Sequence, residues 1–130
     1  MKMPSPHVVP LSRQARQVLG ALVELAGDGR WLLPGGHDHE RPMSNNALLF
    51  ALYRMGFKGE MTGHGFRGVA STALHEAGFQ HEHIELQLAH QRRNRVSAAY
   101  DWAQYLPQRA EMMQWWADWL DERRGEPLRL

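Results

Sequence analysis

The chain has 130 residues, of which 43% are hydrophobic, and a formal net charge of +1 at pH 7 with neutral histidines. This length suits one domain or part of one, and the balanced charge argues against a nucleic-acid binder that relies on net charge alone. The absence of cysteine excludes disulfides and thiolate metal sites, and no stretch approaches the ~18 uninterrupted apolar residues of a membrane span. No long apolar run follows Lys2, so no signal peptide is expected.

In chain order, the sequence predicts a short strand at the front followed by helices. Residues 7–12 (HVVPLS) are expected to form the strand, and together with the turn at residues 2–7 they could be half of a small hairpin. Helices are expected over about 13–26, 44–55, 64–77, 81–88, from 95 onward, and 106–121. The expected fold class is therefore mainly α, with a short N-terminal β-hairpin or strand and about five to six helices.

Several local signals set the ends and the inward faces of these helices. Ser12 and Ser44 are the expected N-caps of the first two helices, and Gly27 and Gly78 are expected to end the first and the third. Helical spacing predicts inward apolar positions in the first two helices: Ala15, Val18, Leu19, Leu22 and Leu25, then Leu48, Leu49, Leu52 and Met55.

The stretch MTGHGFRGVAST, residues 61–72, places a histidine and an arginine three positions apart. At about 100° per residue, one face of this helix is apolar and the other is polar. The apolar face comprises Phe66, Val69, Ala70, Ala73, Leu74 and Ala77, and the polar face His64, Arg67, Ser71 and His75. His64 and Arg67 are neighbours in the first turn, where free N–H groups and the helix dipole favour an anion. The alternative interpretation is an ordinary solvated face.

A second group of reactive side chains lies in LQLAHQRRNRVSAAY, residues 86–100. His90 closes a short apolar run and Tyr100 follows ten residues later, with Arg92, Arg93 and Arg95 between them. A tyrosine hydroxyl has an ordinary pKa of about 10 and needs nearby cations or proton acceptors to act as a nucleophile. A half-buried core aromatic and a loop histidine remain the alternatives.

Two H-x-H pairs raise the possibility of a metal site. His37 and His39 form one pair, and His81 and His83 form the other. Such side chains diverge by about 200° on a helix, and neither an HExxH motif nor cysteine accompanies them. We therefore expect no metal site, and we expect HEHIE to be the exposed first turn of a helix.

The last helix carries a strongly amphipathic stripe. Its members are Met112, Trp115, Trp116, Trp119 and Leu120. This spacing predicts either core packing within the same chain or docking onto a second copy of the protein.

The ordered set His64-x-x-Arg67, His90 and Tyr100 resembles the catalytic signature of the tyrosine recombinases, the phage-integrase family. MTGHGFRGVAST resembles the family's H-x-[LF]-R box, QLAH resembles its L-[GA]-H box, and a tyrosine about ten residues later is the family's nucleophile. Lys2 and Pro10, with VVPLS, resemble the hairpin that carries a catalytic lysine. MTGHGFR, AAY and MMQWWADWLD look most similar to integrases of P4-like prophages.

The resemblance implies a site-specific DNA recombinase that cleaves DNA through a 3′-phosphotyrosyl intermediate without a cofactor. Tyr100 would be the nucleophile, and the supporting residues would be Arg67, His64, His90 and Lys2. The implied partners are double-stranded DNA attachment sites and other integrase protomers, in a synaptic tetramer of the intact enzyme. The implied location is the cytoplasm of a bacterial cell, in association with the nucleoid, and no membrane contact is expected.

One part of the family's pattern has no counterpart. The family has a further catalytic arginine upstream of the lysine hairpin, and only Met1 precedes Lys2 here. We therefore expect residues 1–130 to be the C-terminal part of an integrase catalytic domain, without the upstream arginine and DNA-binding domains, and to be inactive or impaired alone. The alternative function is a noncatalytic helical DNA-binding module, which would not require Tyr100.

Overall fold

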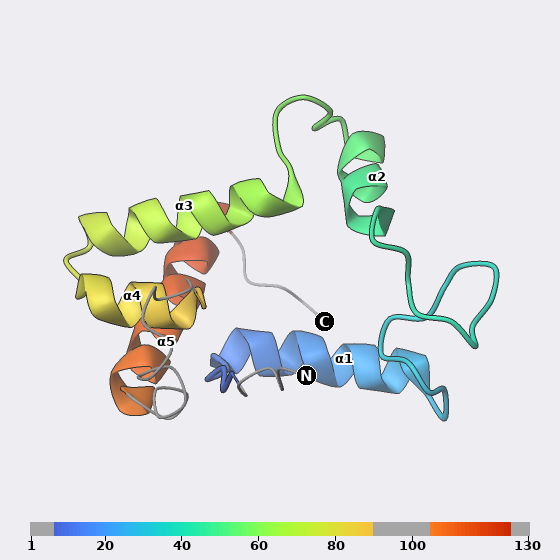
Figure 1. Cartoon of the computed structure of the whole chain (residues 1–130), viewed down its shortest axis with the longest axis horizontal. Helices are drawn as coiled ribbons and strands as arrows, with labels where there is room; N and C mark the ends of the chain where they lie inside the picture. Colours follow the sequence, from blue (N-terminus) through green and yellow to red (C-terminus); the bar gives the residue numbers. More distant parts are fainter. Residues whose placement is uncertain (1–6, 90–104, 126–130) are drawn as a thin grey trace, which may run out of the picture. The chain divides into compact units, whose positions relative to one another are not determined.

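The computed structural model describes residues 7–89 and 105–125, and this part of the chain is mainly helical (Figure 1). Its helices are α1 (Arg13–Ala26), α2 (Ala47–Arg54), α3 (Gly63–Glu76), α4 (His81–Gln87) and α5 (Leu106–Arg124). The predicted mainly α class is thus confirmed. No described helix is long and apolar enough to cross a membrane.

The strand predicted over residues 7–12 does not form in the described part of the chain. A strand needs a neighbouring strand for its backbone hydrogen bonds, and the carbonyl of Val8 accepts instead from the side chain of Arg109. The β-type pairing among the described residues is one isolated antiparallel bridge between Pro34 and Pro42, in the loop between α1 and α2. The residues before His7 in the predicted hairpin lie outside the described residues.

The bounds of α1, α3 and α4 agree with the predicted ones to within one residue, and α5 runs on to Arg124 instead of ending at Asp121. The helix predicted from residue 95 onward lies outside the described residues. The remaining difference is at the start of α2. The helix begins at Ala47, whose N–H donates to the carbonyl of Ser44 in a preceding turn at 3.1 Å. Asn46 occupies the N-cap position and makes no side-chain capping bond, so the predicted cap at Ser44 is wrong. Gly27 and Gly78 follow α1 and α3 with φ of 55° and 86°, the left-handed geometry that favours glycine at helix ends.

The described chain divides into two compact units. Residues 7–13, 70–89 and 105–125 belong to the first unit, and residues 14–69 belong to the second. The boundary falls within α3, between Val69 and Ala70.

The first unit has a small apolar core where α3, α4 and α5 meet. Leu74, Ile84 and Met112 are fully buried, one from each helix. Partly buried side chains pack around this cluster: Phe79, Leu88, Met113, Trp115 and Trp116. Much of the predicted stripe of α5 therefore packs within its own chain, while Leu120 at its far end is 44% exposed.

The second unit has no fully buried side chain among its described residues, so the predicted inward positions of α1 and α2 are not buried. Leu25 is 83% exposed and Leu48 is 61% exposed. The predicted apolar face of α3 is only partly buried. Ala73 and Leu74 are buried, while Phe66 is 53% exposed. Amphipathic spacing identifies which face of a helix is apolar, but burial also requires a partner surface.

We expect Met112→Ala to lower the free energy of unfolding by about 2–5 kcal/mol, because it leaves a cavity among fully buried neighbours. Urea unfolding of the chain, followed by circular dichroism, measures the change. The matched control is Leu120→Ala on the same helix, whose side chain is 44% exposed and should matter much less. Equal losses from both substitutions would contradict the assigned core.

Candidate active site

The N-terminal turn of α3 is built by the residues that precede His64. The Thr62 hydroxyl accepts a hydrogen bond from the N–H of Gly65 at 3.0 Å, which is the geometry of a helix N-cap. A Cβ on Gly65 would come within 2.7 Å of the Met61 sulfur, so a larger residue here would require the flexible Met61 side chain to move. Thr62 thus caps a helix that begins one residue before His64, and the missing side chain of Gly65 leaves room for Met61.

His64 and Arg67 both lie near this end of α3, as predicted. They are the second and fifth residues of the helix, so the i,i+3 spacing puts them on one side. His64 is exposed, and Arg67 is half-buried with polar contacts of its own. An exposed histidine and a half-buried guanidinium thus lie near the N-terminal end of a helix, whose dipole favours an anion such as phosphate.

The other predicted site residues lie outside the described residues. They are Lys2, His90, Tyr100, and the loop arginines Arg92, Arg93 and Arg95. Their convergence with His64 and Arg67 therefore stays a prediction.

The histidines of α4 differ from one another in their surroundings. His81 is exposed, and its Nδ1 lies 3.0 Å from Nε2 of His75, whose Nδ1 donates to the Ser71 carbonyl at 2.7 Å. His83 is buried, and its ring centroid lies 4.5 Å from that of Tyr105. The prediction that HEHIE is an exposed turn is thus wrong for His83 and for Ile84, which is fully buried, because His83 packs against Tyr105 and Ile84 lies in the apolar core of the first unit.

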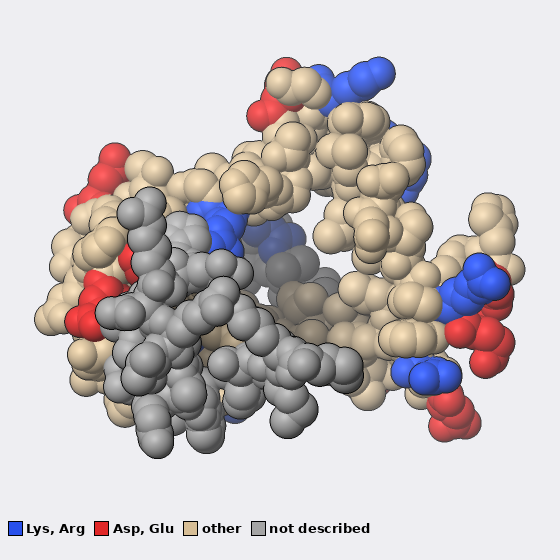
Figure 2. All heavy atoms as spheres, in the orientation of Figure 1, with Lys and Arg blue, Asp and Glu red and all other residues tan. Residues whose placement is uncertain are grey.

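No group of three or more histidine or acidic side chains in the described ranges is arranged to hold a metal ion. His37 and His39 flank Asp38, which forms an ion pair with Arg41 at 3.4 Å. In this loop between α1 and α2, acidic and basic side chains lie next to each other in the space-filling view (Figure 2). The loop therefore presents mixed charge and not a uniformly basic surface.

Sequence reasoning missed one polar residue of the first unit, Arg109 of α5. Its side chain is fully buried, and desolvation lowers the pKa of its guanidinium below the ordinary value. Nε donates to Oε1 of Gln87 at 3.0 Å, and an Nη donates to the Val8 carbonyl. Its burial could have been predicted from the helical spacing, because Arg109 precedes Met112 by three positions and lies on the same face of α5 as the apolar stripe.

Comparison with known proteins identifies relatives over the whole chain. Residues 1–124 match the phage integrase family. The integrase of Enterobacteria phage P4 is 47% identical over 134 aligned positions, which cover 100% of this chain and 30% of that protein. The integrase of Shigella phage Sf6 is 42% identical, covering 90% of this chain and 31% of that protein, and so is the prophage integrase IntS of Escherichia coli K12.

The chain thus spans about a third of the length of the curated relatives it matches. No solved structure shows a significant match. The extent of the family match and the identity to several integrases lead to one conclusion: the chain belongs to the phage integrase family.

Proposed function

We propose that residues 1–130 form the C-terminal part of the catalytic domain of a tyrosine-type site-specific DNA recombinase. The observation that carries the proposal is the capped start of α3, which presents His64 and Arg67 on one side of the helix in a member of the phage integrase family. The substrate is a double-stranded DNA attachment site. The reacting group is a single phosphodiester of its backbone.

In the proposed reaction, Tyr100 attacks the scissile phosphorus. The bond between the tyrosine oxygen and phosphorus forms, and the bond between phosphorus and the 5′-oxygen breaks. The tyrosine proton passes to a base, for which His64 is the candidate, and the departing 5′-oxygen takes a proton from Lys2. The products are a 3′-phosphotyrosyl link and a free 5′-hydroxyl. A 5′-hydroxyl of a partner strand then reverses the attack, which exchanges strands without hydrolysis or ATP.

Cationic side chains supply the stabilisation of the transition state in this scheme. The planar fork of Arg67 matches two nonbridging oxygens of the phosphate, and His90 donates to a nonbridging oxygen. These groups act where negative charge builds on the pentavalent phosphorus, so no divalent metal is required. Arg92, Arg93 and Arg95 would contact the DNA backbone outside the scissile position.

The intact enzyme supplies what these residues lack. The family's further catalytic arginine has no counterpart here, and we assign it, with the DNA-binding domains, to the remaining part of a longer protein. Other protomers complete the assembly, because strand exchange between two duplexes requires four cleavages in a synaptic tetramer.

The isolated chain should therefore form covalent complex with DNA far more slowly than the intact enzyme. Losing one group that stabilises the transition state costs about 10²–10³ in rate, by analogy with an oxyanion-hole donor. The measurement uses a suicide attachment-site duplex, nicked so that the cleaved strand diffuses away, and counts the covalent complex that survives denaturation. Absence of any complex with the intact enzyme would contradict the proposed function, and equal rates would contradict the division of the site.

A further inference from the structure

A cluster of polar contacts in the first unit, centred on the buried side chain of Arg109, joins three segments that are distant in sequence. Its members are His7, Val8, Gln87 and Arg109, called here the Arg109 node. The Arg109 side chain donates to the Gln87 amide oxygen at 3.0 Å and to the Val8 carbonyl. The His7 ring nitrogen Nε2 lies 3.2 Å from the Gln87 backbone carbonyl. Residues 7 and 8 are thus bound to both the end of α4 and the first turns of α5.

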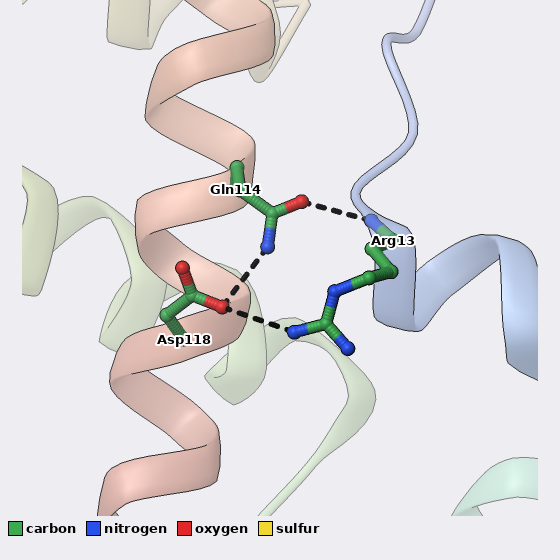
Figure 3. Close-up of polar contacts among 3 residues, drawn as sticks. All are labelled: Arg13, Gln114 and Asp118. Atoms are coloured by element: carbon green, nitrogen blue, oxygen red, sulfur yellow. Dashed lines mark hydrogen bonds and ion pairs between the residues drawn. The ribbon is translucent and has the colours of Figure 1, made fainter.

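The segment that begins with residues 7 and 8 contacts α5 a second time at Arg13, the first residue of α1. The backbone N–H of Arg13 donates to Oε1 of Gln114 at 2.9 Å, and its guanidinium lies 3.9 Å from Oδ1 of Asp118 (Figure 3). The Gln114 amide also donates to Asp118 at 2.9 Å, which holds both acceptors in place. Residues 8–13 therefore follow α5 in its own direction, fixed to it at both ends.

Chain connectivity relates the node to the proposed reaction. Lys2 lies five positions before His7, and a stretch of five residues reaches at most about 18 Å. Gln87 ends α4, three positions before His90. The place where residue 7 is fixed consequently limits where Lys2 can act.

We propose that Arg109 is a positioning residue for the DNA cleavage step, which holds residues 7 and 8, the described residues nearest in sequence to Lys2, against the end of α4. The inference rests on the proposed function, in which Lys2 protonates the departing 5′-oxygen. Arg109 itself makes no contact with DNA in this role.

Arginine suits the role because of its donor geometry. Its guanidinium has five N–H donors in a rigid plane, so it can bind acceptors of two segments at once and fix their separation. Arg109 is fully buried, and Nη1 has no hydrogen-bond partner within the described residues. A buried cation is costly for stability, which an apolar side chain of similar volume would avoid. An apolar side chain could not donate the hydrogen bonds that Arg109 makes to Val8 and Gln87.

The test compares two DNA substrates in the intact enzyme. One has the normal 5′-oxygen at the scissile position, and the other has a bridging sulfur. A thiol has a pKa near 8.5, far below that of an alcohol, so a 5′-thiolate leaves without a proton from a general acid. Loss of general-acid catalysis should therefore slow cleavage of the oxygen substrate alone.

Arg109→Met should slow covalent-complex formation on the oxygen substrate by about 10²-fold or more, the usual contribution of a positioned general acid. The sulfur substrate should recover most of that loss, as it should for Lys2→Ala. Arg109→Lys, which keeps the charge and one donor group, should fall between Arg109→Met and wild type on the oxygen substrate. The matched control is Arg124→Met, an exposed arginine at the other end of α5, which should leave both substrates unaffected.

Equal loss on both substrates would overturn the inference, because a merely destabilised protein cannot distinguish the two leaving groups. Should Arg109→Met fail to fold, Arg109→Lys with Gln87→Ala makes the same comparison with smaller changes. Failure of the proposed function has a different signature: the wild-type enzyme then forms no covalent complex with either substrate.

Discussion

Replacing Tyr100 with phenylalanine in the intact enzyme is expected to abolish the covalent complex with DNA. The substitution removes the one oxygen that attacks phosphorus and leaves the aromatic ring. Removing the nucleophile of an enzyme that forms a covalent intermediate costs about 10⁶-fold in turnover, as measured for a serine hydrolase. Cleavage of the suicide duplex should accordingly fall below detection, while DNA binding measured by gel shift should persist.

Tyr105→Phe is the matched control for this prediction. It makes the same chemical change five positions later, at a tyrosine whose hydroxyl lies 3.5 Å from a Glu82 carboxylate oxygen. That contact is at the limit of a hydrogen bond and is exposed, so its loss should have little effect. If Tyr105→Phe abolished the complex and Tyr100→Phe retained it, the assignment of the nucleophile would be wrong.

Arg67→Lys should lower the rate of covalent-complex formation by about 10²–10³-fold at saturating DNA, although it keeps the positive charge. Lysine offers a compact ammonium and no planar fork, so it cannot bind two nonbridging oxygens in the geometry that arginine provides. Because the interaction strengthens as charge develops on phosphorus, the loss should appear in the rate at saturation more than in DNA affinity.

The control for Arg67 is Arg54→Lys, a conservative change at an exposed arginine in the last turn of α2. Arg67 is half-buried and has contacts within the protein, so thermal unfolding of each variant should accompany the kinetics. A rate within twofold of wild type for Arg67→Lys would indicate that Arg67 supports the fold and does not bind the reacting phosphate.

The sequence by itself determined the features of this protein that depend on near neighbours in the chain. Helical periodicity and a glycine after the last turn predicted α1 and α3 to within a residue or two, because both signals act within a few positions. The same local rule placed His64 and Arg67 on one side of a helix, which is the part of the candidate site that the described residues contain.

Tertiary structure decided what depends on residues distant in sequence. Residues 7–12 have the composition of a strand, yet the Val8 carbonyl is bound by Arg109, 101 positions away. His83 is buried by packing against Tyr105, although Glu82 and Glu85 lie close to it in sequence. Composition predicts what a segment favours alone, whereas burial and pairing depend on the free energy of contact with partners that only folding brings together.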